Sequence, residues 1–391
     1  MPAELSTQHT HTRYCAVERS LYTILLSVSH TSDLTTMASS SGLAGLAVLL
    51  TAVLCLQLPA ASRAQLQVGF YDTTCPNAES IVQQAVADAF ATNSGVAAGL
   101  IRLHFHDCFV NGCDASVLLS VNPAGGDPER DTPPNNPSLR GFEVVDAARA
   151  ALEQSCPSTV SCADILAFAA RDSINLTGSD VFYQVPSGRR DGSVSNGSLA
   201  FTLPGPNLTA DELVKGFADR NMTAEEMVVL SGTHTLGRSH CNSFIVRNRE
   251  RLASGTISPA YQALLEALCP ANTSRFTNVT TEIDLSTPTV LDNNYYKLLP
   301  LNLGLHFSDD QLIRNATLKA SVDSFAANET LWKEKLVAAM IKMGELQPKT
   351  GAEGEIRLNC SIVNTASSSS SSSARLIEVL RPGSDNEVAS S

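Results

Sequence analysis

Eight of the ten cysteines, spread over most of the chain, constrain the fold more than any other feature. They all follow a predicted export signal and lie between residues 75 and 360. An even number of cysteines in an exported chain predicts a disulfide-stabilised domain, here with four bridges. Spacing alone leaves the pairing open, because eight cysteines allow on the order of 100 connectivities. The CxxC pairs typical of zinc ribbons are absent from the sequence.

Both ends of the chain are predicted to lie outside the working domain. Residues 37–64 open with a polar lead and an apolar stretch, and they end in small residues, as a secretory signal peptide does. Residues 1–36 carry no motif and are interpreted as an N-terminal extension that translation from Met37 would omit. The serine-rich residues 365–391 are predicted to form a flexible tail. The domain is therefore predicted to span residues 65–364, enough for two interlocked halves.

Charge and hydropathy exclude two classes of protein. The chain has 27 Lys and Arg against 39 Asp and Glu, a formal net charge of −12. Sequence-independent binding to nucleic acid or to an anionic membrane surface needs clustered positive charge, so neither is expected. The most apolar stretch, residues 43–58, is interrupted by polar residues and is too short to span a bilayer. No membrane association is expected after removal of the signal.

The periodicity of the domain is helical. Apolar residues recur at helix spacing from Ile81 to Phe90, and a second apolar stripe from Trp332 to Met343 stops at Gly344. Alternating strand patterns are rare, so the fold class is predicted to be mainly α. Three Ser or Thr residues precede an acid by three positions, as in the capping boxes that begin helices: Ser161 with Asp164, Thr209 with Glu212, and Thr223 with Glu226.

The segment IRLHFHDCFVNGCDAS, from Ile101 to Ser116, has two competing interpretations. A strand would place His104 and His106 on one face, a pair suitable for zinc. A helix would instead bring Arg102 and His106 together, a fixed cation beside a base with a pKa of about 6.5. The apolar residues just upstream favour the helix. A buried structural histidine with a salt-bridged arginine is the alternative to a functional pair.

Two further segments carry candidate metal ligands. Asp107, Asp114 and Ser116 lie at short spacing in a loop bounded by two cysteines. Hard oxygen ligands at such spacing suit Ca²⁺, and a solvated acidic turn is an equal alternative. Further along, a capped helix is predicted to end at Gly232, and His234 follows. A histidine at a helix end is either a ligand or a favourable partner of the helix dipole.

Seven long segments occur in a fixed order: RLHFHDCFVNGCDASVLL from Arg102, LRGFEVVD from Leu139, TVSCADILAFAARD from Thr159, VPSGRRDG from Val185, LSGTHTLGRSHC from Leu230, DLSTPTVLDNNYY from Asp284 and GEIRLNC from Gly354. Together they closely resemble the secreted haem peroxidases of plants, the class III family. The resemblance covers essentially all of residues 65–364. It implies the haem peroxidase fold, in which two interlocked helical halves hold a haem between them. It also implies an enzyme that reduces hydrogen peroxide to water while oxidising phenolic donors in one-electron steps.

The resemblance implies a role for each residue at a matching position. His234 is similar to the proximal ligand of the haem iron, and Asp309 to the carboxylate that accepts its other ring proton, with the adjacent Asp310 as the alternative. On the opposite face of the haem, His106 resembles the distal base and Arg102 the group that stabilises developing charge. The other implied residues are Asn135, which orients His106, Glu129 in the same network, Phe105 at the haem, and Pro204 and Phe244 at the donor access.

The family further implies one non-covalent haem b, two Ca²⁺ ions and four disulfides. The first calcium site would comprise Asp107, Val110, Gly112, Asp114 and Ser116. The second would comprise Thr235, Asp284, Thr287, Val290 and Asp292. The implied disulfides are Cys75 to Cys156, Cys108 to Cys113, Cys162 to Cys360, and Cys241 to Cys269.

Several positions depart from the family pattern. Tyr183 stands where Trp is usual, Leu291 and His306 replace more typical aromatic and aliphatic residues, and FIVRNRERL stands after Cys241 in place of the usual RLYNF. The Tyr183 departure is expected to affect packing, and the others bear on donor preference rather than on peroxide cleavage. Two other classes stay open as alternatives. One is a non-enzymatic secreted glycoprotein that keeps the fold, and the other is a zinc hydrolase built on the two histidines of the LHFH segment.

Expectations for the whole protein follow from the export signal and the resemblance. Its partners would be hydrogen peroxide and small phenolic donors, and it would act as a monomer. It would be secreted to the extracellular space or cell wall, with the vacuole as the alternative if the tail is a sorting signal. Cell-wall and lignin chemistry, defence or oxidative stress would be its setting.

Overall fold

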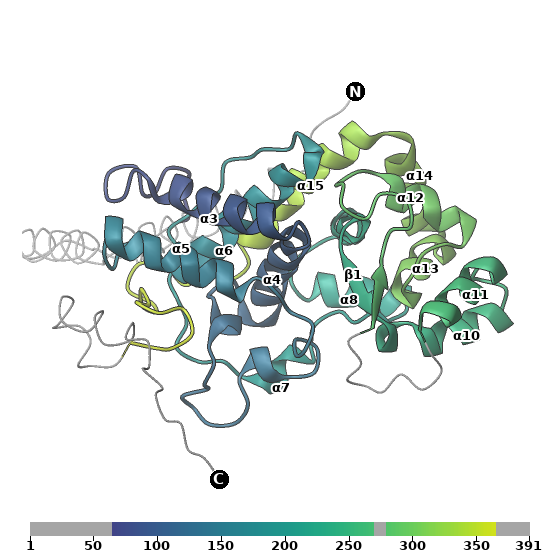
Figure 1. Ribbon diagram of the computed structural model, residues 1–391, viewed down its shortest axis with the longest axis horizontal. Helices are drawn as coiled ribbons and strands as arrows, with labels where there is room; N and C mark the ends of the chain where they lie inside the picture. The colour runs from purple at the N-terminus through teal and green to yellow at the C-terminus, as the bar shows by residue number, and fades with distance from the viewer. Residues whose placement is uncertain (1–64, 270–278, 365–391) are drawn as a thin grey trace, which may run out of the picture. The chain divides into compact units, whose positions relative to one another are not determined.

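The computed structural model describes residues 65–269 and 279–364, whose arrangement is shown in Figure 1. The predicted N-terminal extension, signal peptide and C-terminal tail lie outside the described residues. Within the described residues the chain forms thirteen α-helices and a single pair of three-residue strands. The prediction of a mainly α fold is therefore confirmed.

The helices and strands have the following bounds. The first seven helices are α3 (Ala78–Thr92), α4 (Val96–Asn111), α5 (Phe142–Ser155), α6 (Cys162–Ile174), α7 (Gly197–Ala200), α8 (Ala210–Ala218) and α9 (Ala224–Ser231). The others are α10 (Ile245–Ala253), α11 (Pro259–Leu268), α12 (Asn294–Leu298), α13 (Phe307–Arg314), α14 (Ala316–Ala327) and α15 (Glu329–Gly344). Strands β1 (Arg238–His240) and β2 (Thr280–Glu282) pair antiparallel.

Polar caps begin α6, α8 and α9 largely as the sequence predicts. Thr209 and Thr223 each accept the N–H of the glutamate three positions later, and the glutamate returns a bond, so both capping boxes are complete. Ser161 accepts the N–H of Asp164, but the reciprocal bond is missing. The Asp164 carboxylate is instead 2.7 Å from the Arg189 guanidinium. Ser161 therefore caps α6 through its own side chain alone, without a complete capping box.

Two groups of helices share one core and interlock. In the first group, α3, α4, α5 and α6 pack on one another, and all thirteen residues of α6 are buried. In the second group, α9 and α12 to α14 pack together, and Figure 1 places α10 to α14 at the opposite end from α3 and α5. The last helix, α15, packs against both α4 and α9. The two interlocked halves that the resemblance implies are therefore present.

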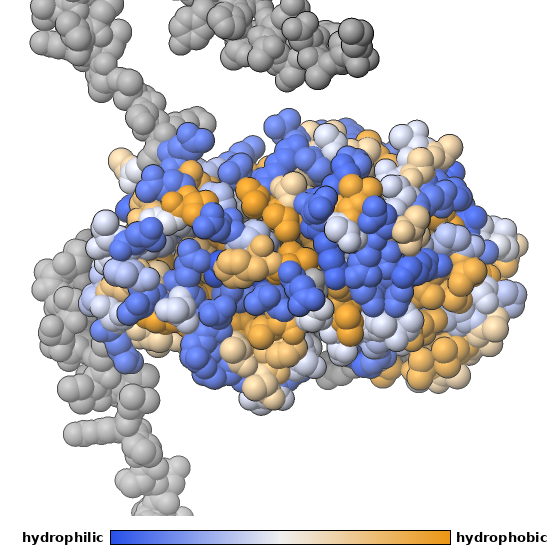
Figure 2. All heavy atoms as spheres, turned by 90° about the horizontal axis from the view of Figure 1, so that it is seen from above, coloured by the Kyte–Doolittle hydropathy of each residue, from blue (hydrophilic) through white to orange (hydrophobic). Residues whose placement is uncertain are grey.

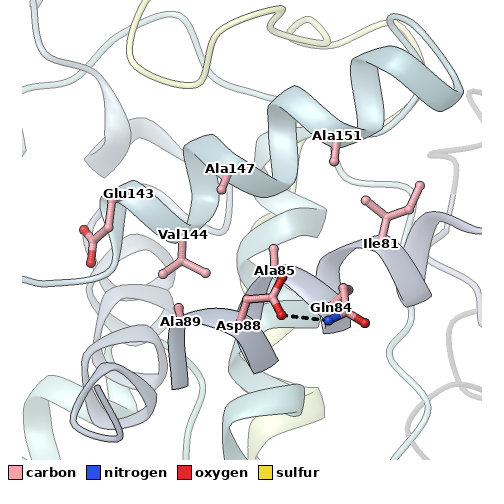
Figure 3. Close-up of a pocket in the computed structure, with 9 residues that line it drawn as sticks. All are labelled: Ile81, Gln84, Ala85, Asp88, Ala89, Glu143, Val144, Ala147 and Ala151. Carbon is pink, nitrogen blue, oxygen red and sulfur yellow. Dashed lines mark hydrogen bonds between the residues drawn. The ribbon is translucent and has the colours of Figure 1, made fainter. Parts of the chain in front are cut away.

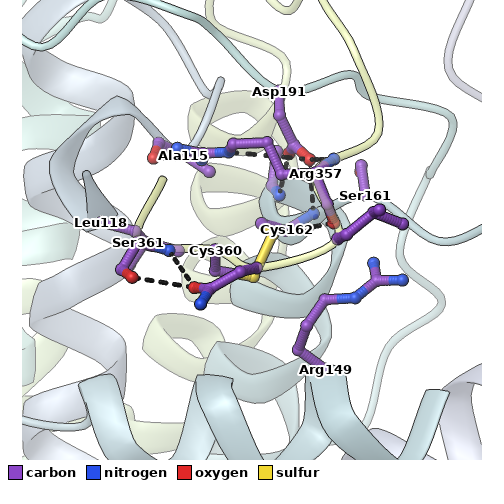
Figure 4. The surroundings of a disulfide bond; sticks show 12 residues. Ala115, Leu118, Arg149, Ser161, Cys162, Asp191, Arg357, Cys360 and Ser361 are labelled. Carbon is purple, nitrogen blue, oxygen red and sulfur yellow. Dashed lines mark hydrogen bonds and ion pairs between the residues drawn. A yellow bond between two sulfur atoms is a disulfide. The ribbon is translucent and has the colours of Figure 1, made fainter. Parts of the chain in front are cut away.

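The four disulfides connect the cysteines that the resemblance implies: Cys75–Cys156, Cys108–Cys113, Cys162–Cys360 and Cys241–Cys269. The third closes a separation of 198 residues and joins the C-terminal segment to the start of α6. Figure 4 shows its surroundings, where Arg357 donates its N–H to Asp191 at 2.9 Å and its guanidinium to the Ala115 carbonyl at 2.6 Å. The segment around Arg357 and Cys360 is thus tied to the first half of the fold.

Removing that long-range disulfide should destabilise the protein more than removing a short-range one. A disulfide restricts the unfolded chain more when it closes a longer loop. We expect Cys162→Ser with Cys360→Ser to lower the free energy of unfolding by about 5 kcal/mol, against about 3.5 kcal/mol for the pair Cys241→Ser with Cys269→Ser. Urea denaturation of both variants measures the difference. An equal or smaller loss from the 198-residue loop would contradict this prediction.

The surface carries apolar residues in separate patches among polar ones, as Figure 2 shows for one face. Exposed apolar side chains on α10 and α11 include Val246, Leu264 and Leu268. Among residues 65–269 and 279–364, no helix is both long enough and apolar enough to cross a membrane.

Candidate active site

Helix α4 decides between the two interpretations of the LHFH segment. The residues around Arg102 are helical, so the strand alternative, and the zinc pair that depended on it, is wrong. His104 lies 3.7 Å from the Cys108 sulfur, inside the core. Burial, followed by the charge of Arg189, lowers the pKa of His104 to about 3. His104 is therefore a neutral core residue, and the next histidine, His106, is the one that enters a polar network.

A chain of hydrogen bonds fixes the His106 ring. Its Nδ1 lies 2.6 Å from the side-chain oxygen of Asn135, and the Asn135 amide donates to the main-chain carbonyl of Glu129 at 2.8 Å. Because the Asn135 oxygen can only accept, Nδ1 carries the proton and Nε2 keeps a free lone pair. The structure thus brings together three of the residues that the sequence singles out. Glu129 takes part through its main chain, while its carboxylate turns to Ser116 at 3.3 Å.

The electrostatics keep His106 neutral beside a fixed cation. Burial, followed by the positive charge of Arg102, lowers the pKa of His106 well below its usual value, and the bond to Asn135 acts in the opposite direction. Burial and the nearby Arg140 lower the pKa of Arg102 to about 10, so the guanidinium stays charged at neutral pH. Arg102 also donates to the Pro134 carbonyl at 3.1 Å. This arrangement supplies a proton acceptor next to a positive charge.

A second histidine is fixed from the other half of the fold. His234 lies in a single 3₁₀ turn after α9, and its Nδ1 is 2.8 Å from Oδ1 of Asp309 on α13. The alternative acid, Asp310, is instead 2.6 Å from Arg314 and 3.6 Å from Arg251. The His234 side chain is 38% exposed, whereas Asp309 is buried. The structure therefore orients one ring nitrogen of His234 and leaves its other edge accessible.

Two partners of Asp309 are absent from the sequence-based prediction. The Tyr295 hydroxyl donates to the same Oδ1 at 2.9 Å, and the His306 N–H donates to Oδ2 at 2.9 Å. The only signal for either residue is that His306 departs from the family pattern. Ligand-type atoms of His234, His306 and Asp309 lie within 4.8 Å of one another, close enough to hold a metal ion. Their closest separations, 2.8 Å and 3.2 Å, match direct hydrogen bonds and ion pairs.

The remaining predicted site residues lie in different surroundings. Phe105 packs on Phe109, with ring centroids 4.2 Å apart, and meets His106 edge-on at 5.7 Å. Pro204 lies half-buried in the loop before α8. Phe244 is 1% exposed, because its ring belongs to the small core under α10 and α11 that the disulfide Cys241–Cys269 closes. It offers no surface to a donor in this structure, which leaves Pro204 as the predicted donor contact.

The first predicted calcium site contains a buried carboxylate oxygen without a partner. Asp107 Oδ1 is buried and accepts no hydrogen bond, while its Oδ2 accepts the Ala115 N–H at 3.0 Å. Burial, followed by repulsion from Asp114, raises the pKa of Asp107 well above its usual value. The Ser116 N–H donates to Asp114 at 3.0 Å. A divalent cation here would satisfy the orphaned oxygen and neutralise the charges.

The second predicted site shows the same signature. Asp284 Oδ2 is buried without a partner, while Oδ1 accepts the N–H of Thr287 at 3.0 Å. The hydroxyls of Thr235 and Thr287 lie 3.2 Å and 3.1 Å from Asp292 Oδ1, and Thr235 also meets the Val290 carbonyl at 3.2 Å. All five predicted ligands belong to these linked contacts or their immediate neighbours in the chain. The oxygen-rich donor set fits Ca²⁺.

A groove of about 550 Å³ lies elsewhere on the surface, between α3 and α5. Figure 3 shows its mainly apolar lining, with Asp88 and Glu143 as the acidic residues. None of its lining residues belongs to the predicted site. We therefore assign it no part in the chemistry.

Comparison with known proteins defines the class. A family model described as "Peroxidase" matches residues 82–328. Peroxidase 1 of Zea mays is 61% identical over 352 residues, which cover 87% of this chain and 96% of the maize protein. Peroxidase 5 of Vitis vinifera is 48% identical over 307 residues, covering 77% and 92% of the two chains. Peroxidase 54 of Arabidopsis thaliana is 42% identical over 339 residues, covering 85% and 93%.

The fold, the four disulfides and these relatives define a peroxidase. The chain belongs to the class III family of plant peroxidases, as its sequence motifs predict, and it is an enzyme of that type. The family implies haem and calcium as cofactors, hydrogen peroxide and an electron donor as substrates, and a secretory route. The non-enzymatic and zinc-hydrolase alternatives are set aside.

Proposed function

We propose that this enzyme is a secreted haem peroxidase that reduces hydrogen peroxide with small phenols as electron donors. The observation that carries the proposal is a pair of histidines from different halves of the fold, each with Nδ1 fixed by an oxygen. His106 is fixed by Asn135 at 2.6 Å and His234 by Asp309 at 2.8 Å. The guanidinium of Arg102 is a source of positive charge at the His106 ring.

His234 has the features of a haem iron ligand. Its Nδ1–H donates to Asp309, so the lone pair lies on Nε2, the atom that binds iron. A carboxylate behind the ring makes the imidazole a stronger donor and fixes its orientation. The accessible edge of the ring is consistent with a ligand at that position. When bound, haem b supplies the redox capacity for two one-electron oxidations of donor molecules.

His106 and Arg102 provide the proton transfer and the charge stabilisation. The neutral Nε2 of His106 accepts a proton from one oxygen of hydrogen peroxide and returns it to the other oxygen, so that water leaves rather than hydroxide. Arg102 stabilises the negative charge that develops as the O–O bond breaks. Asn135 holds the His106 tautomer that this cycle needs. Two phenol molecules each lose one electron and one proton, which balances the reduction of one peroxide to two waters.

Two Ca²⁺ ions would hold the loops next to both histidines. Asp107 follows His106 and Thr235 follows His234 in the chain, so each ion would fix the backbone beside a functional ring. The support is the unpartnered buried oxygen on Asp107 and on Asp284. Lys349, at 3.0 Å from Asp114, offsets only part of the negative charge at the first site.

Removing calcium should lower the stability of the protein. It should also change how the melting temperatures of two variants compare with that of the parent. At a calcium concentration 100 times Kd, each ion stabilises the folded state by about 2.7 kcal/mol. We expect Asp107→Asn and Asp284→Asn to melt below the parent when calcium is present. With chelator, both should melt at or above it, because a buried unpaired charge has been removed. Melting curves with and without chelator test this, and a parent protein indifferent to chelator would contradict structural calcium.

We assign the donor access to the loop at Pro204 and the destination to the extracellular space or cell wall, with vacuolar sorting by the tail as the alternative. The setting would be lignin and cell-wall chemistry, defence or oxidative stress, and the enzyme would act as a monomer. The test is to express the full chain in a secreting host and to measure haem content, calcium content and guaiacol oxidation by hydrogen peroxide. Secreted protein that carries haem and oxidises guaiacol supports the proposal, and protein without haem refutes it.

A further inference from the structure

His306 is a polar side chain at a position where the family usually has an aliphatic one, and it lies beside the proposed iron ligand. It is buried, and its ring centroid is 5.2 Å from that of His234. Its Nε2 lies 2.9 Å from the hydroxyl of Ser239 on β1, and its Nδ1 lies 3.2 Å from Asp309 Oδ2. The imidazole therefore lies between a hydroxyl and the carboxylate that orients His234.

The two oxygens of Asp309 have different partners. Oδ1 accepts from His234 at 2.8 Å and from Tyr295 at 2.9 Å. Oδ2 accepts the main-chain N–H of His306 at 2.9 Å and also faces the His306 ring. Every donor to a carboxylate weakens its attraction for the proton it shares with another partner. The groups around Oδ2 therefore set how strongly Asp309 pulls on the His234 Nδ1–H.

The contact with Ser239 helps to decide which ring nitrogen of His306 carries the proton. The ring faces both the main-chain N–H of Asp309, as the N-cap of α13, and the Asp309 carboxylate at 3.2 Å. The full negative charge of the carboxylate outweighs the amide dipole, so the proton belongs on Nδ1 and the Ser239 hydroxyl donates to Nε2. Nδ1 has no well-aligned hydrogen-bond partner among the described residues. Its N–H dipole nevertheless acts on a buried carboxylate at short range, where the local dielectric is low.

We propose that His306, oriented by Ser239, is a positioning residue that moderates the Asp309–His234 hydrogen bond and so makes the reduction potential of the bound iron less negative. The inference rests on the proposed function of His234 as the iron ligand. Without the His306 ring, Asp309 would attract the His234 proton more strongly. The imidazole would then become a stronger donor, which favours the ferric over the ferrous state.

The test compares His306→Leu with His306→Asn in the haem-loaded enzyme. Leu removes the N–H donor, and we expect its ferric-to-ferrous ratio at a fixed potential to rise about tenfold, which is about 59 mV for one electron. The iron–histidine stretching band of its ferrous form should move to higher frequency in resonance Raman spectra. Asn places an amide N–H near the position of Nδ1, so both values should stay close to those of the parent.

A double-mutant cycle with Ser239→Ala separates positioning from general disturbance. Ser239→Ala should shift the potential in the same direction as His306→Leu but by less, and it should have no effect in the His306→Leu background. An unchanged or more positive potential in His306→Leu would overturn the inference, while normal haem binding and peroxide reactivity would leave the proposed function intact. If the parent bound no haem, the proposed function itself would fail.

Discussion

A His106→Ala variant is expected to bind haem like the parent and to react with hydrogen peroxide about 10² to 10⁴ times more slowly. The structure leaves Nε2 of this ring free to accept a proton, because Nδ1 is engaged by Asn135 at 2.6 Å. Alanine removes the base without touching the residues around His234. Stopped-flow absorbance at the Soret band under excess peroxide measures the rate constant directly.

Two further variants make the result specific. His104→Gln changes a buried histidine on the same helix that packs near the Cys108 sulfur, so its peroxide reaction should match the parent. Asn135→Val removes the acceptor that fixes the His106 tautomer, and its rate should fall between those of the parent and His106→Ala. A His106→Ala variant with the parental rate constant would refute the assignment of His106 as the base.

A His234→Ala variant should lose haem, or bind it at least about 100-fold more weakly, because the proposed iron ligand is gone. The neighbouring groups are poor substitutes, because Asp309 uses Oδ2 for the His306 N–H and the buried His306 ring is held by Ser239. Haem titration followed at the Soret band measures the affinity. Circular dichroism confirms that the apoprotein is folded.

The neighbouring acids supply a matched pair of variants. Asp309→Asn changes the group 2.8 Å from the His234 ring and should weaken haem binding by about 10- to 100-fold. Asp310→Asn changes a buried acid that pairs with Arg314 at 2.6 Å, so it should affect stability rather than haem affinity. Equal haem affinities for the two variants would contradict the choice of Asp309.

The sequence predicted the architecture well because local signals and long-range ones agree. Helix caps at Thr209 and Thr223 are local rules, and both boxes form as predicted. The pairing of Cys162 with Cys360 over 198 residues is beyond any local rule, and only the resemblance to the family implied it. The choice of Asp309 as the partner of His234 also came only from the resemblance, because spacing cannot distinguish it from the adjacent Asp310.

What the sequence could not provide is the direction of side chains in three dimensions. The resemblance places Glu129 in the network of His106, but it does not indicate that Glu129 contacts Asn135 through its main-chain carbonyl, at 2.8 Å, rather than through its carboxylate. Phe244 was assigned to the donor access, yet its ring is turned into the core under α10. His306 could be noticed only as a departure. Its approach to Asp309 is a local contact at the start of α13, whereas its contact with Ser239 depends on how α13 packs near β1.

The most direct test of the account is a single-turnover reaction of the secreted protein loaded with haem and calcium. Stoichiometric hydrogen peroxide is mixed with the enzyme, the Soret band is followed by stopped flow, and guaiacol is then added. We expect a rapid spectral change that guaiacol reverses in two steps. Protein that binds haem normally, but whose Soret band stays unchanged when peroxide is added, would contradict the proposed peroxidase function.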